Sequence, residues 1–461
     1  MYTYKDISPI PPFPTGEPAF VNELRKYSSR QPHWQNDATI PENMTGILKK
    51  WEIKNNFLDP EKLLDTAFSA LERFRKAYVT NEDGILTILV NCDSSFESEE
   101  YSIQIEKDTI TIIGGDTEGI RRAIYALIDL MRGSNIPALE RETIRKKPWL
   151  KNRISRCFFG PIKRAPFFRD ELTDDVDYYP EGYLDLLASE GVNGIWLTIV
   201  WKELAKTEFF PEDAQRNQRI AKLQKTVEKC RKYGIKVWIF CIEPASWRPG
   251  NPLPHGCEEM QGEPTTFGGY QAFCIASKLS QKYVRETSKS IFSEVPNLGG
   301  MMLISLGERP TSCLSYAYDN EDGKLPCSSK CGFSPSKILD TVLSSIKAGI
   351  KDAGSKAEVL SWLYNPRPAQ IKEWWFDLPL ELDEDKILAF NFESGTTKYQ
   401  TGRVHAGGDY WLSAVGPSDR FGRIAAAAKG HCELAAKLQV GCSHELATIP
   451  FTPKCFIALY F

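Results

Sequence analysis

The sequence predicts an α/β protein in which a small α+β domain precedes a (β/α)8 TIM barrel. Its 461 residues exceed the roughly 250 to 300 at which a single hydrophobic core stops growing, which indicates two domains. Strand and helix patterns mix irregularly in the first third of the chain. From Arg153 onward, short apolar runs alternate with amphipathic helices. We therefore expect an irregular arm at 1–45, an α+β domain at 46–147 and a barrel at 148–461.

The elements of the expected α+β domain follow from caps and periodicity. Asp59 and Pro60 suit the N-cap and first position of a helix, and apolar residues then recur at helical spacing as far as Phe74. Asp116 caps a second predicted helix, which ends at Gly133. Between the helices, alternating or continuous apolar residues predict strands at Ile85–Val90, Tyr101–Ile105 and Ile110–Ile113.

The expected barrel rests on seven apolar runs that read as parallel strands. These are Arg153–Phe159, Asn193–Trp201, Lys236–Glu243, Met301–Leu306, Glu358–Tyr364, Ile387–Glu393 and Lys437–Cys442. The helix before the third run has apolar residues at helical spacing from Ile220 to Cys230, with Gly234 just past its end. An open doubly wound sheet is the structural alternative, but no Gly-rich fingerprint follows any of the runs.

An eighth strand cannot be assigned. Tyr410–Val415 follows the sixth run too soon for a crossover helix, so we expect a loop excursion there. The chain stops at KCFIALYF, where an eighth unit would begin. Either the sequence is truncated or the barrel closes irregularly.

Composition and charge exclude two classes of partner. Hydrophobic residues make up 42% and no stretch approaches the roughly 18 apolar residues of a membrane span. The net charge of −3 gives no long-range attraction toward nucleic acid. The N-terminal MYTYKDISPIPPFPTGEP lacks a signal-peptide pattern, so we expect a cytoplasmic protein, or a secreted or periplasmic one if the sequence is trimmed. Composition does not set the oligomeric state.

Carboxylates stand at the ends of four predicted strands, where a βα barrel has its active site. Glu243, Glu308 and Glu393 end the third, fourth and sixth runs, and Glu445 follows the seventh. Glycoside hydrolysis needs one protonated acid and a second carboxylate, and neither metal nor cofactor. We expect Glu308 to be the acid, because Gly307 lets the backbone bend close to a ligand. Each carboxylate also has a structural alternative, which is to pair with a loop Arg or cap a helix.

Aromatic residues at or after strand ends favour a sugar site. Trp201, Trp247, Trp362 and Tyr364 would form a stacking wall, although core packing explains each of them equally well. His444, next to Glu445, is positioned to hydrogen-bond a sugar hydroxyl.

Twelve cysteines are too few for a disulfide scaffold. Cys313, Cys327 and Cys331 lie on one loop with partial zinc-site spacing, but a structural zinc needs a fourth ligand. We expect unligated thiols or one disulfide there, and no metal. We likewise expect no metal at His255, Cys257 and Cys274. A metal-dependent hydrolase using these loops remains a third functional class.

The segment EEYSIQIEKDTITIIGGDTEGIRRAIYALIDLMR (Glu99 to Arg132) resembles the N-terminal domain shared by family 20 β-N-acetylhexosaminidases and α-glucuronidases. Two further segments resemble the start of their barrel, namely WLKNRISRCFF and DDVDYYPEGYLDLLASEGVNGIWLTIVW. YWLSAVGPS and KLQVGCSHELATIPFTP resemble uncharacterised bacterial glycosidase-like proteins. The resemblance covers about residues 80 to 455.

The resemblance implies roles for individual residues. Glu308 matches the hexosaminidase general acid, but Gly307 stands where those enzymes have an Asp that orients the substrate acetamide. Arg153 matches a first-strand Arg that holds sugar hydroxyls. Glu308 with Glu445 resembles the pair of retaining barrel glycosidases, and Glu393 would join the base if the enzyme inverts, as α-glucuronidases do.

Together these observations predict a glycoside hydrolase of polysaccharide degradation. The expected activity is β-N-acetylhexosaminidase-like, with Glu308, Glu445 and Glu393 as catalytic carboxylates. The expected substrate contacts are Arg153, Trp201, Glu243, Trp247, Trp362, Tyr364 and His444. An α-glucuronidase-like hydrolase and a non-catalytic carbohydrate-binding protein with a degenerate barrel are the alternatives.

Overall fold

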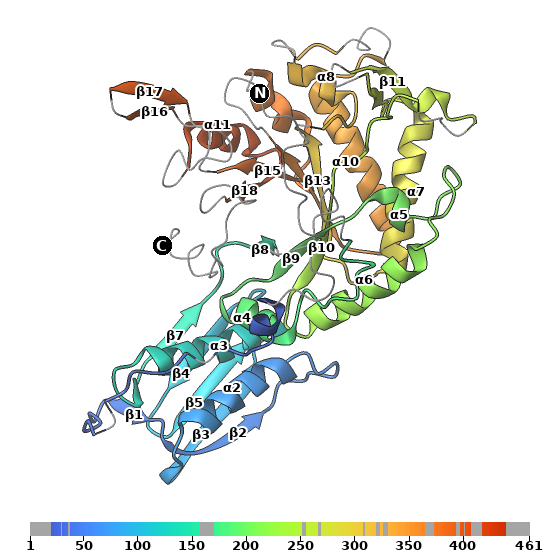
Figure 1. The fold of residues 1–461 in the computed structure, drawn as a ribbon. Coiled ribbons are helices and arrows are strands. Elements are labelled where there is room, and N and C mark those ends of the chain that lie inside the picture. The colour runs from blue at the N-terminus through green and yellow to red at the C-terminus, as the bar shows by residue number, and fades with distance from the viewer. Residues whose placement is uncertain are drawn as a thin grey trace, which may run out of the picture. The chain divides into compact units, whose positions relative to one another are not determined.

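The computed structural model describes residues 20–28, 30–35, 37–156, 170–250, 255–265, 269–307, 309–319, 323–325, 331–364, 373–392, 397–400, 402–406 and 417–438 (Figure 1). The chain divides into two compact units. Unit 1 comprises Met1–Ser155, Phe159–Ile195 and Glu228–Lys236. Unit 2 comprises Arg156–Phe158, Trp196–Val227 and Val237–Phe461.

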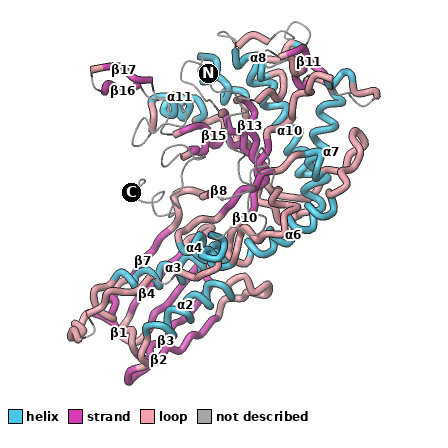
Figure 2. The backbone as a smooth tube through the Cα atoms, viewed as in Figure 1, coloured by secondary structure: helices cyan, strands magenta, loops and turns pink. Residues whose placement is uncertain are grey.

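Unit 1 contains a five-stranded sheet in the order β2-β3-β5-β4-β7. Its strands are β2 (Lys49–Asn55), β3 (Glu82–Cys92), β4 (Tyr101–Ile105), β5 (Thr109–Gly114) and β7 (Thr143–Lys146). Figure 2 draws strands in magenta. β2, β3 and β5 run parallel, while β4 runs antiparallel to both of its neighbours. Every second residue of β3 from Leu86 to Val90 is buried, as the period of a strand requires. The three strands predicted here are confirmed.

Two helices of unit 1 test the predicted caps. α3 (Thr117–Gly133) begins after Asp116, whose carboxylate accepts a hydrogen bond from the Gly119 N–H at 2.7 Å, as predicted. α2 (Asp65–Tyr78) begins later than the sequence predicts. The Asp59 carboxylate instead accepts hydrogen bonds from the N–H groups of Leu63 and Leu64. Between them and Asp59, Lys62 has a φ of 56°, which is incompatible with a continuing helix.

Short elements complete the described part of unit 1. They are α1 (Phe20–Leu24), β1 (Met44–Gly46), β6 (Ala138–Glu140) and α4 (Glu181–Ser189). β1 pairs with β6, so the expected irregular arm includes a strand at its end.

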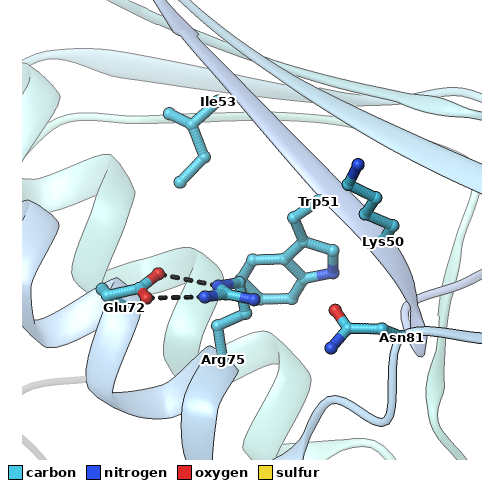
Figure 3. Close-up of a pocket in the computed structure, with 6 residues that line it drawn as sticks. All are labelled: Lys50, Trp51, Ile53, Glu72, Arg75 and Asn81. Carbon is cyan, nitrogen blue, oxygen red and sulfur yellow. Dashed lines mark hydrogen bonds and ion pairs between the residues drawn. The ribbon is translucent and has the colours of Figure 1, made fainter.

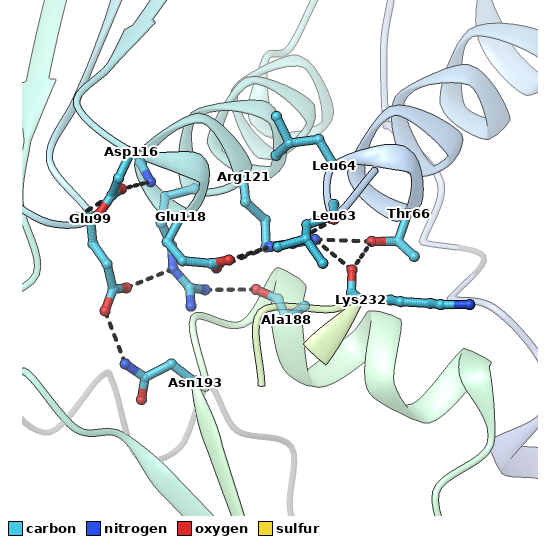
Figure 4. A network of polar contacts seen from close by, with 12 residues as sticks. Leu63, Leu64, Thr66, Glu99, Asp116, Glu118, Arg121, Ala188, Asn193 and Lys232 are labelled. Carbon is cyan, nitrogen blue, oxygen red and sulfur yellow. Dashed lines mark hydrogen bonds and ion pairs between the residues drawn. The ribbon is translucent and has the colours of Figure 1, made fainter. Parts of the chain in front are cut away.

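A buried polar network holds the elements of unit 1 together (Figure 4). The Arg121 side chain is fully buried and donates to Thr66, Glu118 and the carbonyls of Leu63 and Lys232. Because an arginine cannot lose its charge in a protein, this burial is tolerable only with such a full set of acceptors.

The second sheet has seven strands in the order β18-β15-β14-β13-β10-β9-β8. These are β8 (Ile154–Arg156), β9 (Gly194–Thr198), β10 (Lys236–Cys241), β13 (Gly300–Leu306), β14 (Glu358–Leu363), β15 (Ile387–Asn391) and β18 (Glu433–Lys437). Neighbouring strands from β10 to β18 are parallel. β13 lies between β10 and β14 and is buried along its whole length, as expected of a strand covered on both faces.

Six of the seven predicted strands are confirmed, and the seventh was placed too late in the sequence. The chain enters the sheet at Glu433–Lys437, whereas the prediction began at Lys437. The prediction followed the more apolar residues after Lys437, while the true strand, ELAAK, carries little hydrophobic signal. Among the described residues β8 and β18 are the outer strands, and Tyr410–Val415 lies outside that part of the chain.

Helices follow the strands of this sheet. They are α5 (Trp201–Leu204), α6 (Arg216–Arg231), α7 (Lys278–Glu294), α8 (Leu314–Asp319), α10 (Pro335–Asp352), the 3-10 helix η4 (Glu373–Glu381) and α11 (Asp419–Ala428). The predicted helix before the third run is α6. α7 and α10 pack closely, and Gly349 permits this because it has no side chain. A Cβ at this position would lie 2.2 Å from the Arg285 carbonyl oxygen. Among the helices described, none is long and apolar enough to cross a membrane.

Smaller elements lie in the loops of unit 2. They are the 3-10 helix η2 (Glu258–Met260) and the strand pairs β11 (Gln261–Pro264) with β12 (Gln271–Phe273), and β16 (Thr397–Gln400) with β17 (Arg403–Ala406).

Candidate active site

The carboxyl edge of the seven-stranded sheet gathers polar and aromatic side chains. Glu243 follows β10, Trp362 and Tyr364 lie at the end of β14, and Asn391 and Lys437 are the last residues of β15 and β18. The parallel register pairs Trp362 with Ala389 and Asn391 with Lys437. The ends of these strands therefore meet at one edge, where parallel sheets place ligand sites.

Glu243 is a buried carboxyl group held by two backbone N–H groups. Its Oε1 accepts from the Trp201 N–H at 3.3 Å and its Oε2 from the Ala245 N–H at 2.6 Å. Burial raises the pKa of Glu243 to about 7, although the two N–H donors act in the opposite direction. The group therefore holds a proton for part of the time at neutral pH, as a general acid requires.

The charge of Lys202 acts on this carboxyl and, against the larger effect of burial, lowers the pKa of Glu243. Burial lowers the pKa of Lys202, and the charge of Glu243 raises it. Its Nζ lies 4.0 Å from the centroid of the Phe210 ring and 4.8 Å from that of Trp247. The ammonium group is thus stabilised by ring faces, and no ion pair with Glu243 forms in the described structure.

Two of the predicted stacking residues, Trp201 and Trp247, are buried among other aromatic rings. Trp201 is 0% exposed and meets Tyr283 edge-on, with ring centroids 6.2 Å apart. Trp247 is 6% exposed and packs between Phe210 and Phe273. These contacts match the core-packing alternative, and stacking on a sugar stays a prediction for both residues.

Trp362 has a partly exposed indole with a fixed orientation. Its Nε1–H donates to Asn391 Oδ1 at 3.0 Å, and Tyr364 meets it edge-on with centroids 5.0 Å apart. Lys437 Nζ lies 5.2 Å from the centroid of the indole ring. Of the three tryptophans predicted to bind sugar, Trp362 alone keeps partial exposure in the described structure.

The described residues on both sides of position 308 are anchored. A Cβ at Gly307 would lie 2.8 Å from Tyr364 Cδ1, so only glycine fits against this ring. Beyond position 308, Thr311 Oγ1 donates to the Ser305 carbonyl at 2.8 Å, and Ser246 Oγ donates to the Thr311 carbonyl. The segment after β13 is therefore tied to β13 itself and to the segment after β10.

The close approach at Gly307 leads to a testable expectation. Replacing Gly307 by Ala forces Tyr364 or the strand end to shift, so we expect the free energy of unfolding to fall by about 1–3 kcal/mol. Urea unfolding followed by tryptophan fluorescence measures it. Gly422→Ala in α11 is the matched control, since a Cβ added there would have no other atom within 4 Å. An unfolding midpoint of Gly307→Ala equal to that of wild type would contradict the close approach.

Arg153 is engaged within unit 1. Its guanidinium donates to Glu99 and to the carbonyls of Gly191, at 2.6 Å, and Leu150, at 2.5 Å. The Glu99 carboxylate also pairs with Arg122 at 3.1 Å. These contacts give Arg153 a structural role without any sugar, and its predicted contact with sugar hydroxyls stays a prediction.

The structure also describes a surface pocket in unit 1, between β2 and α2 (Figure 3). Its volume is about 560 Å³, and it is lined by Lys50, Trp51, Ile53, Glu72, Arg75 and Asn81. Glu72 and Arg75 form an ion pair at 2.6 Å across its wall. None of the predicted site residues lines it.

Four predicted site residues lie outside the described part of the chain, namely Glu308, Glu393, His444 and Glu445. Cys327 also lies outside it, and no group of three metal-binding side chains occurs among the residues that are described.

Sequence reasoning missed Lys202, Asn391 and Lys437. Two of them carried a usable signal. Lys202 directly follows a predicted site tryptophan, and Asn391 interrupts an otherwise apolar strand. Lys437 was taken as the start of a strand rather than its end, which concealed its position at the carboxyl edge.

Comparisons with known proteins bear on the fold. No family model matches the sequence, and no curated protein is similar to it in sequence. Among solved structures, a GH138 enzyme targeting pectin rhamnogalacturonan II is similar with a TM-score of 0.51 and 14% identity, over 75% of this chain and 39% of that one. An inactive mutant of a GH20 exo-β-N-acetylglucosaminidase from Vibrio harveyi is similar with a TM-score of 0.50 and 10% identity, over 92% of this chain and 71% of that one.

The chain therefore shares the fold of glycoside hydrolases. It spans 39% of the length of the GH138 enzyme, and both identities are low. Fold likeness at this level does not carry activity with it, so function has to be argued from the site.

Proposed function

We propose that this protein is a glycoside hydrolase whose catalytic carboxyl groups lie at the carboxyl edge of the seven-stranded sheet. One observation carries the proposal. β13 lies between β10 and β14, so the chain leaves it between Glu243 and Trp362, and Glu308 comes two residues after the end of β13. The chain thus leaves β13 between a buried acid and a partly exposed indole, and the proposal assigns the acid role to Glu308 in the segment that follows. The fold shared with glycoside hydrolases supports this assignment.

The proposed reaction uses two carboxyl groups with different tasks. Glu308 gives its proton to the glycosidic oxygen as the bond to the anomeric carbon breaks. Glu445 attacks the anomeric carbon or directs a water molecule to it, with Glu393 as the alternative second carboxylate. A separation of about 5–5.5 Å between the carboxyl groups would give retention, and about 6.5–9.5 Å would give inversion.

Glu243 and Trp362 are the proposed substrate contacts within the described structure. A carboxyl group with a pKa of about 7 can donate a hydrogen bond to a sugar hydroxyl without adding a full negative charge to the site. Trp362 offers a ring face for stacking, and its hydrogen bond to Asn391 fixes the plane of that ring before substrate arrives.

The packing at Gly307 bears on which mechanism is used. In the hexosaminidases that the sequence resembles, an Asp at this position orients the substrate acetamide as an internal nucleophile. Here the ring of Tyr364 fills the space that any side chain at position 307 would need. We therefore propose a route through two protein carboxylates rather than substrate assistance, whether or not the sugar is an N-acetylhexosamine.

A uronide is the second candidate substrate, and Lys437 favours it. Its ammonium group lies 5.2 Å from the Trp362 ring, where a sugar stacked on the indole could place a carboxylate against it. An α-glucuronidase-like hydrolase would need such a cation, whereas a neutral hexosaminide would not.

A panel of chromogenic aryl glycosides tests the proposal. We expect release of the aryl alcohol from at least one of the N-acetylglucosaminide, glucuronide, galactoside and fucoside, with the uronide favoured if Lys437 binds a carboxylate. Calorimetry with the corresponding free sugars runs in parallel. Binding without release from any glycoside would contradict hydrolysis and indicate a carbohydrate-binding protein with a degenerate barrel.

A further inference from the structure

Cys274 and Cys313 lie next to each other on two neighbouring segments of unit 2. Phe273, the last residue of β12, forms a parallel bridge with Ser312. The Phe273 N–H donates to the Thr311 carbonyl, and the Cys313 N–H donates to the Phe273 carbonyl, each at 3.1 Å. Each cysteine directly follows one of the bridged residues.

This pairing brings the two backbones to the distance that a disulfide spans. Parallel strands lie about 4.8 Å apart, and the Cα atoms of disulfide-bonded cysteines are usually about 4.4–6.8 Å apart. Side chains at matching positions of a parallel pair point to the same face. The Cys313 thiol donates to the carbonyl of Phe273, the residue directly before Cys274, at 3.6 Å. Both side chains are in the reduced, thiol form in this structure.

The environment gives the two thiols different reactivity. Interaction with the Cys313 side chain, together with the backbone N–H groups of Ser277 and Ala276, lowers the pKa of Cys274 to about 6 although burial opposes it. Cys274 is partly exposed, whereas Cys313 is 2% exposed. Cys230 differs, because full burial raises the pKa of its thiol to about 12.

We propose that Cys274 and Cys313 form a redox-active dithiol that small-molecule disulfides, such as glutathione disulfide, oxidise to an intramolecular disulfide. The Cys274 thiolate attacks one sulfur of glutathione disulfide, which forms a mixed disulfide and releases one glutathione thiolate. The Cys313 thiol then loses its proton and attacks the Cys274 sulfur. The second glutathione leaves, so two protein thiols are oxidised and one glutathione disulfide is reduced to two glutathione molecules.

The disulfide would link the segment that leads into α7 with the segment that follows β13. The second of these segments is continuous with the residues anchored by Thr311, on the far side of position 308. Oxidation would therefore restrain the chain beside the carboxyl edge of the sheet. The inference rests on the two cysteines alone and holds whether or not the protein hydrolyses glycosides.

Peptide mass spectrometry after reduction and re-oxidation tests the proposal. The protein is reduced with dithiothreitol, freed of reductant, equilibrated with mixtures of reduced and oxidised glutathione, and trapped with acid and an alkylating agent. We expect one peptide pair joined through Cys274 and Cys313, with the loss of two hydrogens. In Cys313→Ser, we expect Cys274 to accumulate as its glutathione adduct, because no resolving thiol remains.

Cys92→Ser is the control, since Cys92 is an exposed cysteine of unit 1. We expect this variant to form the Cys274–Cys313 disulfide at the same glutathione ratio as wild type. Two results would overturn the proposal. One is a stable Cys274 glutathione adduct in wild type without the internal disulfide, and the other is a disulfide from Cys274 to a different cysteine.

Discussion

Glu308→Gln is expected to lower turnover of a p-nitrophenyl glycoside by about 10²–10⁴-fold, because the amide cannot protonate the leaving oxygen. A leaving group that needs no proton separates this loss from a general disturbance. With a dinitrophenyl glycoside of the same sugar, we expect most of the lost rate to return. Initial rates of chromophore release for the two substrates measure the difference.

Glu445→Gln should behave differently from Glu308→Gln. A residue that acts at the anomeric carbon is needed whatever the leaving group, so its loss should slow both substrates alike. Glu384→Gln, at an exposed position outside the site, is the control and should keep the wild-type rate. Equal losses for both leaving groups in Glu308→Gln would remove the general-acid role from Glu308.

The pH dependence of stability should report the buried carboxyl of Glu243. Its pKa is about 7 in the folded protein and about 4.5 when unfolded, so between these values the folded state binds more protons. Stability therefore falls as pH rises through this window, and the total loss is about 3 kcal/mol. Below about pH 4.5 and above about pH 7, this group contributes no further change.

Urea unfolding of wild type and Glu243→Gln at several pH values isolates this contribution. The difference in unfolding free energy between the two proteins should shift by about 3 kcal/mol in favour of the variant between about pH 4.5 and pH 8. Gln offers one acceptor oxygen to two backbone donors, which adds an offset that does not depend on pH. Glu384→Gln, which replaces an exposed carboxylate outside the site, is the control and should show no such shift. A pH-independent difference would show that folding does not raise the pKa of Glu243.

Most of the sheet could be predicted from sequence because buried parallel strands carry continuous apolar runs. β13, GMMLISL, is such a run and was placed within one residue. β18 was misplaced because ELAAK owes its place to pairing with β15 rather than to its own hydrophobicity. The late start of α2 depends on the positive φ of Lys62, which no local sequence pattern predicts.

The candidate site divides in a similar way. That Glu243 lies at the end of an apolar run is local information, and the sequence contains it. Its raised pKa is not local, because it results from burial of the carboxyl group in the folded protein. The position of Lys437 beside Trp362 likewise depends on the register of three strands. The sequence can therefore indicate candidate site residues. Tertiary packing determines which of them lie close together and how their pKa values shift.

A double-mutant cycle on Glu308 and Glu445 tests the central claim that two carboxyl groups act on the same glycosidic bond. Rates of release from the best aryl glycoside are compared for wild type, each Gln variant and the double variant. The claim predicts that the double variant is about as slow as the slower single variant, because groups that act as a unit are strongly non-additive. Losses that multiply as for independent sites, or wild-type rates in either single variant, would contradict it.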